Sequence, residues 1–196
     1  LHVECVAPTT GSGPDGVPPL RRIGLFAEDQ LLLRIAQGFA SKRDKFADYL
    51  KKASIKSNDY CVIALNRGSF GMAGDGLMPL IVKAAYGVGH LSVPIHEKSS
   101  VPPFWSRRES IEKASRAAVP TTFFEEPTSA MISAVLYSSA NVLNQQIEQH
   151  WCVVHNPRAA MPLPFGVFWY VDQYVVDENM ISKMPANGKV ERDCDI

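Results

Sequence analysis

Two clusters of polar side chains follow apolar, strand-like runs in this 196-residue sequence. Because ligand sites in open α/β sheets gather at the carboxyl ends of strands, each cluster is a candidate ligand or nucleic-acid site. The other interpretation is that each cluster is an ordinary polar turn. The candidate residues are Ser138 and Ser139, after run 131–137, and His155, Asn156 and Arg158, after run 151–154.

Hydrolysis by a serine or cysteine nucleophile is the least favoured use of these residues. The sequence has no Gly-x-Ser-x-Gly motif, and a Ser138 nucleophile would need a histidine and a carboxylate beside it. Cys152 is close in sequence to His150 and His155. It stands in the middle of an apolar run, however, where we expect a buried and unreactive thiol.

A single carboxylate, Glu4, lies in the strand-like run 1–7, and a long amphipathic helix is predicted from Glu28 to Lys52. Apolar residues at spacings of three, four and seven indicate the helix, and acids at its start and lysines at its end favour it. Lys42 and Arg43 flank the apolar stripe. Either their side chains cover apolar surface and keep their charges in water, or they direct a cation at an anionic group beside the sheet.

A second group of cations lies in the polar segment 96–120. Arg107, Arg108 and Arg116, together with Trp105, could bind a phosphate backbone, although an exposed charged loop is the commoner meaning of such a segment. The whole chain has 20 basic and 20 acidic residues. Nucleic-acid binding would therefore need a local basic patch.

The cysteines and the termini bear on the setting of the protein. The four cysteines are widely spaced without a Cys-x-x-Cys pair, which argues against zinc and indicates a reducing, cytoplasmic setting. No apolar run approaches the length of a membrane span, and residues 1–7 do not form a signal peptide. The sequence begins without Met inside a strand-like run, so we expect that further residues precede Leu1.

Strands that alternate with helices predict a single α/β domain over residues 1–196, with a mixed central sheet flanked by helices. We expect a core half at 1–95, an exposed excursion at 96–122, further strands at 123–176 and a frayed tail at 177–196. Residues 167–176 alternate aromatic and polar side chains, which is typical of an edge or half-exposed strand. The shorter predicted elements are strands at 60–65, 91–95 and 111–114 and helices at 77–86 and 122–130.

An acid-bearing strand, a long helix and an apolar strand follow one another over Leu1–Leu65. This order resembles the downstream part of the PD-(D/E)xK, or restriction-endonuclease-like, nuclease core, and it implies that the first elements of the core precede Leu1. Several motifs are also similar to uncharacterised bacterial proteins associated with this fold. They are Val3-Glu4-Cys5-Val6-Ala7-Pro8, Gly13-Pro14-Asp15, Arg34-Ile35, Ala134-Val135-Leu136-Tyr137-Ser138-Ser139 and Val154-His155-Asn156-Pro157.

The resemblance implies a catalytic role for Glu4 as the second acid of a site for Mg²⁺, with Mn²⁺ as a substitute. The family places a lysine two residues after this acid, where Val6 stands here. In some members the lysine has moved to the following helix, so Lys42, or with less support Lys45, would fill that role. The implied function is metal-dependent hydrolysis of DNA, or a relative that has lost catalysis.

The alternative is a non-enzymatic module that binds a protein or a nucleic acid. It is motivated by the neutral net charge and by the incomplete catalytic set. The sequence leaves open whether the protein is an enzyme, what its substrate is and how it oligomerises.

Overall fold

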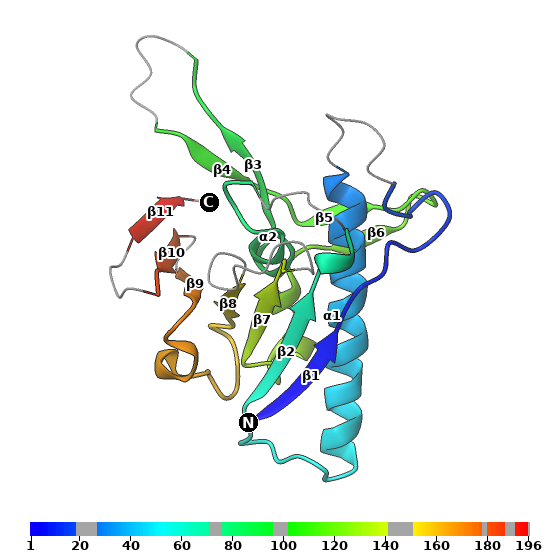
Figure 1. The fold of residues 1–196 in the computed structure, drawn as a ribbon, viewed down its shortest axis with the longest axis vertical. Helices are drawn as coiled ribbons and strands as arrows, with labels where there is room; N and C mark the ends of the chain where they lie inside the picture. Colours follow the sequence, from blue (N-terminus) through cyan, green and yellow to red (C-terminus); the bar gives the residue numbers. More distant parts are fainter. Residues whose placement is uncertain are drawn as a thin grey trace.

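A seven-stranded mixed sheet forms the body of the protein in the computed structural model (Figure 1), which describes residues 1–18, 27–70, 76–95, 102–140, 151–177, 180–186 and 191–195. The strand order is β1-β2-β7-β8-β9-β10-β11. The strands are β1 (His2–Val6), β2 (Cys61–Asn66), β7 (Ala134–Ser138), β8 (Trp151–His155), β9 (Asp172–Asp177), β10 (Met180–Met184) and β11 (Glu191–Asp195). Strands β1, β2 and β7 are parallel, and β8 runs in the opposite direction to β7.

Helix α1 (Glu28–Lys51) connects β1 to β2 and confirms the predicted long helix. Its apolar stripe is buried, with Ile35, Phe39 and Phe46 fully removed from solvent. The stripe packs in the same core as the inward side chains of β2 and β7. This burial of an amphipathic face, more than the intrinsic propensity of the sequence, stabilises a helix of this kind.

The two faces of the sheet are covered differently. In β2, Ile63 and Leu65 pack into the main core together with α1 and α2 (Leu80–Tyr86), while Val62 faces the other way. Val62 packs in a smaller core with Leu163 and Val171 from the segment that follows β8. Within the described ranges the two α-helices therefore share one face, and a loop segment covers part of the other face. The prediction of an α/β fold with a mixed sheet is confirmed, and the helices flank this sheet on a single side.

The expected excursion at 96–122 is more ordered than the sequence suggested. Residues 96–101 lie outside the described part. The rest includes β4 (Phe104–Arg107), which pairs with β3 (Val88–Ser92), and β5 (Ser110–Glu112), which pairs with β6 (Ala118–Pro120). Trp105 and Ile111 are buried, so these hairpins have a packed side. The β3–β4 hairpin extends away from the main sheet in Figure 1.

Asp15 ties the early loop to the second of these hairpins. Its carboxylate accepts a hydrogen bond from the Ala114 amide at 2.7 Å, and its carbonyl oxygen accepts one from Arg34 of α1 at 2.9 Å. These two bonds give Asp15 a structural role in the loop.

Three other expectations differ from the structure. The helix expected at 122–130 is replaced by the 3₁₀ turns Phe123–Glu125 and Pro127–Ser129, because Pro127 cannot donate a helical hydrogen bond. The strand expected at 167–176 starts later, as β9, and it is an interior strand that pairs with β8 and β10. In the tail expected to fray, the described residues include β10 and β11, which pair antiparallel.

Candidate functional site

Glu4 lies on β1, an edge strand of the described sheet, and contacts three side chains of α1. Its Oε2 accepts hydrogen bonds from the Nζ atoms of Lys42 at 3.2 Å and Lys45 at 2.8 Å, and its Oε1 accepts one from the Tyr49 hydroxyl at 2.8 Å. The Glu4 side chain is 13% exposed. We call these four residues the Glu4 centre.

Helical geometry explains why these three partners converge on Glu4. Residues 42, 45 and 49 are spaced by three and four positions, which places them on one face of a helix. The alternation of side chains along β1 directs Glu4 and Val6 towards that helix. The sequence pointed to Lys42 and gave less weight to Lys45, which is the nearer lysine. Tyr49 was not predicted. It follows Lys42 by seven residues, about two helical turns, and this spacing could have placed it on the same face of the helix.

Electrostatics keeps the Glu4 centre ionised. Burial acts to raise the pKa of Glu4, but the hydrogen bonds from Lys45, Tyr49 and Lys42 outweigh burial and hold the pKa below its usual value. The hydrogen bond to Glu4 in turn raises the pKa of Lys45. One carboxylate therefore faces two cationic amines, which leaves the centre with a net positive charge at neutral pH.

The described residues do not fit a divalent cation at Glu4. Magnesium requires several oxygen ligands, and both carboxylate oxygens of Glu4 already accept hydrogen bonds from α1. Among the residues that the structure describes, no group of three His, Cys, Asp or Glu side chains could hold a metal ion. The side chains required to complete the site that the resemblance implies are not found in this part of the chain.

The carboxyl-terminal half of α1 and the turn after it are locally basic. Residues 42–56 contain six lysine and arginine residues against two aspartates, in a chain whose formal net charge is zero. Four of these lysines have exposed side chains, and we call them the lysine surface. They are Lys45, Lys51, Lys52 and Lys56. This surface adjoins the Glu4 centre through Lys45, which belongs to both.

Three arginines considered for anion binding, Arg43, Arg107 and Arg108, are paired with acids of the same chain. Arg43 contacts Glu126, and Arg107 donates two hydrogen bonds to the Glu125 carboxylate at 2.7 and 2.6 Å. Arg108 lies 2.8 Å from an Asp29 carboxylate oxygen and 3.7 Å from one of Glu28. Their charges are thus balanced within the fold, and a phosphate would have to compete with these carboxylates.

The two polar clusters that follow strands lie at opposite ends of the sheet. Because β7 and β8 are antiparallel, Ser138 is paired with Trp151 at the start of β8, and His155 at its end is paired with Ala134. The structure therefore does not bring Ser138 and Ser139 together with His155, Asn156 and Arg158 in one site.

The second cluster makes internal contacts. The buried Asn156 amide donates to the carbonyl oxygens of Ser129 and Ile132 at 3.0 and 2.8 Å, and Arg158 donates to the carbonyl oxygen of Glu125 at 3.3 Å. These bonds fix the turn after β8 against the 3₁₀ turns.

His155 is also held internally, 2.7 Å from the Gln173 side-chain oxygen, and burial lowers its pKa. Cys152 is three residues away on the same strand, so the two side chains point to opposite faces. The thiol and imidazole considered for a hydrolase are therefore apart, and His150 lies outside the described residues.

Comparisons with known proteins assign no family. No family model matches the sequence, and searches of the curated proteins and of the solved structures found no match. No helix in the described part of the chain is long and apolar enough to cross a membrane.

Proposed function

We propose that this protein is a nuclease-like module that binds the phosphodiester backbone of a nucleic acid along the lysine surface, beside the Glu4 centre. The observation that carries the proposal is the convergence of Lys42 and Lys45 on one carboxylate at a sheet edge. From that point the exposed lysines continue along the end of α1.

The dimensions and chemistry of the surface suit a phosphate backbone. A helical rise of about 1.5 Å per residue spreads Lys45 to Lys52 over about 10 Å, whereas phosphates follow one another every ~3.4 Å along the axis of a duplex strand. The lysines could therefore contact several phosphates of one strand. Lysine and arginine side chains that neutralise phosphates supply essentially all of the sequence-independent affinity of proteins for nucleic acids. The Arg107 and Arg108 guanidinium groups are paired with acids, so they are not required for this mode of binding.

Binding of this kind does not require a divalent cation. Glu4 neutralises part of the charge of Lys42 and Lys45, so it limits the affinity and orients the two amines. The proposal thus corresponds to a relative of the nuclease core that binds its polymer without cleaving it.

Anisotropy of a fluorescent 20-base-pair DNA duplex, titrated at several salt concentrations without divalent ions, tests this function. Each lost phosphate contact reduces the slope of log affinity against log salt by about 0.9. The double variant Lys51→Gln/Lys52→Gln should therefore lower the slope by up to about 1.8. The matched control Lys113→Gln/Lys183→Gln removes the same charge elsewhere. Equal effects of the two variants, or no binding at 50 mM salt, would contradict the proposal.

Metal-dependent hydrolysis of DNA is the second candidate function. It is favoured by the 3.2 Å contact between Lys42 and Glu4, which is the arrangement that the resemblance implies for a lysine carried by the helix. Further ligands would have to come from outside the described residues.

Incubation of the protein with supercoiled plasmid and Mg²⁺ or Mn²⁺ tests this second candidate. Cleavage that is lost in both Glu4→Gln and Lys42→Met, and retained in Asp172→Asn, would support it. DNA binding without any cleavage would support the first candidate alone.

A further inference from the structure

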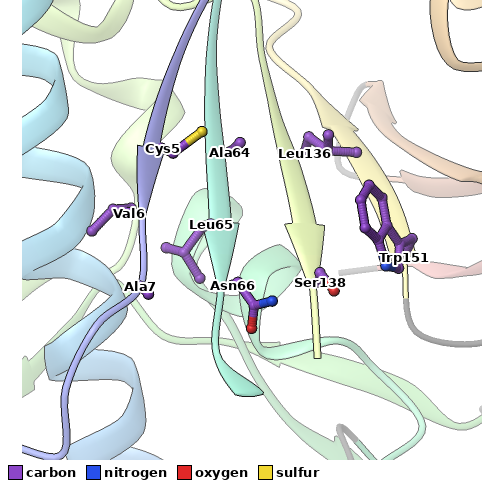
Figure 2. Close-up of a pocket in the computed structure, with 9 residues that line it drawn as sticks. All are labelled: Cys5, Val6, Ala7, Ala64, Leu65, Asn66, Leu136, Ser138 and Trp151. Atoms are coloured by element: carbon purple, nitrogen blue, oxygen red, sulfur yellow. The ribbon is translucent and has the colours of Figure 1, made fainter. Parts of the chain in front are cut away.

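A hollow of about 260 Å³ opens on the sheet face opposite the helices, at the carboxyl ends of β1, β2 and β7 (Figure 2). This is the end of a parallel sheet where ligands commonly bind. Its lining includes Cys5, Ala64, Asn66, Leu136, Ser138 and Trp151. The hollow is separate from the Glu4 centre, because Glu4 and Cys5 are neighbours on β1 and point to opposite faces.

The register of the strands explains the shape of the hollow. Cys5 is paired with Ala64, and Ala64 is paired with Leu136, so the three side chains form a row across three strands. The small side chain of Ala64 leaves space between its two larger neighbours, as Figure 2 shows. Trp151, which is paired with Ser138, forms the wall on the β8 side. The floor is apolar, and the wall is an indole ring whose Nε1 has no hydrogen-bond partner among the described residues.

Asn66 and Ser138 both present donors to the hollow. The Asn66 Oδ1 accepts the amide hydrogen of Gly68 at 2.6 Å, so its NH₂ group is left to donate. The Ser138 Oγ accepts the amide hydrogen of Ala140 at 3.1 Å, so its hydroxyl hydrogen is also left to donate. Within the described part of the chain, neither of these donors has an acceptor. Each of the two acceptor oxygens, in contrast, already accepts one hydrogen bond from the backbone.

Gly68 fixes the two donors relative to each other. A Cβ atom at this position would lie 2.3 Å from the Ala140 carbonyl oxygen, which real structures do not allow. Only glycine lets the loop after β2 approach the end of β7 this closely. The donors of Asn66 and Ser138 are therefore positioned before any ligand arrives, and this lowers the entropic cost of binding.

We propose that this hollow binds an uncharged, mainly apolar molecule through a carbonyl oxygen. Its body packs on Ala64, Leu136 and Trp151, and its oxygen accepts hydrogen bonds from the Asn66 amide and the Ser138 hydroxyl. Among the described residues, no ionised side chain lines the hollow. A carboxylate would therefore lose its hydration without gaining a cation, and an ammonium group would lose its hydration without gaining a carboxylate.

Three probes with the same ring test the proposed ligand class: acetophenone, benzoate and benzylamine. They are titrated into ¹⁵N-labelled full-length protein, and the indole signals of the three tryptophans are followed by NMR, with Trp151 assigned from the Trp151→Phe variant. Acetophenone should shift the Trp151 indole and the Asn66 side-chain amide, with an affinity at least tenfold higher than that of the two charged probes. Equal affinities for the three probes, or no shift up to the solubility of acetophenone, would overturn the proposal.

Two variants show whether binding occurs in this hollow. Ala64→Leu fills the floor and should abolish the acetophenone shifts, whereas Ala117→Leu, the same change at an exposed position, should leave them unchanged. Ser138→Ala removes one donor and should weaken acetophenone binding about fivefold, which corresponds to one hydrogen bond of about 1 kcal/mol. Acetophenone shifts that persist in Ala64→Leu would refute this location. Ala64→Leu does not alter the lysine surface, so this variant should keep the DNA affinity of the native protein. The proposal of ligand binding in the hollow can therefore fail without the proposal of DNA binding, and the reverse also holds.

Discussion

Replacing Glu4 by glutamine should strengthen DNA binding at low salt and make it more sensitive to salt. In the native protein the Glu4 carboxylate contacts the Lys42 and Lys45 amines at 3.2 and 2.8 Å. Glutamine has nearly the same shape but no charge, so the variant frees both cations to bind phosphates.

The magnitude follows from the number of amines released. Each additional phosphate contact steepens the slope of log affinity against log salt by about 0.9, so two freed lysines steepen it by up to about 1.8. Between 200 and 50 mM salt, the affinity of the variant should then increase up to about 12-fold more than that of the native protein. The change should also cost about 1–2 kcal/mol of folding free energy, because the hydrogen bonds to a charged acceptor become hydrogen bonds to a neutral one.

Anisotropy titrations at four salt concentrations measure the slope directly, and urea unfolding monitors the fold. The matched control is Asp172→Asn, which removes one negative charge from a carboxylate that lies 3.1 Å from Lys183, away from α1. If Glu4→Gln and Asp172→Asn change the slope equally, or if Glu4→Gln weakens binding at low salt, the Glu4 centre is not part of the binding surface.

Three further predictions concern stability and reactivity. The pKa of Glu4 is held below its usual value of 4.5, so the stability that the ionised carboxylate contributes is present above that pH and is lost as the pH falls through the lowered pKa. The difference in urea midpoint between the native protein and Glu4→Gln should therefore shrink below about pH 4.5. Burial, with the nearby Asp59 charge, raises the pKa of the Cys61 thiol to about 11. Iodoacetamide at pH 8 should therefore label the exposed Cys5, and it should label Cys61 only in denaturant. Mass spectrometry of the peptides measures the labelling of each cysteine. Phe46→Ala should lower the free energy of unfolding by about 3–5 kcal/mol in chemical denaturation, because the ring is fully buried in the core; a loss below 1 kcal/mol would contradict the described packing of α1.

Local patterns in the sequence were sufficient to predict α1, β2 and the α/β class, because helical and strand periodicities are properties of short segments. They also placed Lys42 beside the apolar stripe, and the structure shows it against β1. The pairing of strands was harder to predict. Nothing in residues 151–154 indicates that β8 runs opposite to β7, and this reversal is what separates Ser138 from His155.

Long-range charge pairing also escaped prediction. Arg107 and Arg108 look like free cations in the sequence, but their partners Glu125 and Asp29 are distant along the chain and approach only in the folded protein. The same limit applies to the hollow beside Trp151, which depends on the small size of Ala64 in a row formed by three strands. Side-chain types can be read from a sequence, whereas the neighbours that neutralise or confine them depend on the topology.

The hydrogen bond from the Ala114 amide to the Asp15 carboxylate joins two surface segments that are 99 positions apart. Surface loops usually tolerate changes in length, because such changes alter the closure entropy only slightly. Here a residue inserted near either partner would pull the other out of place, and the contact with Arg34 would transmit the displacement to α1. These two loops are therefore poor positions for epitope tags or inserted domains, although both lie at the surface.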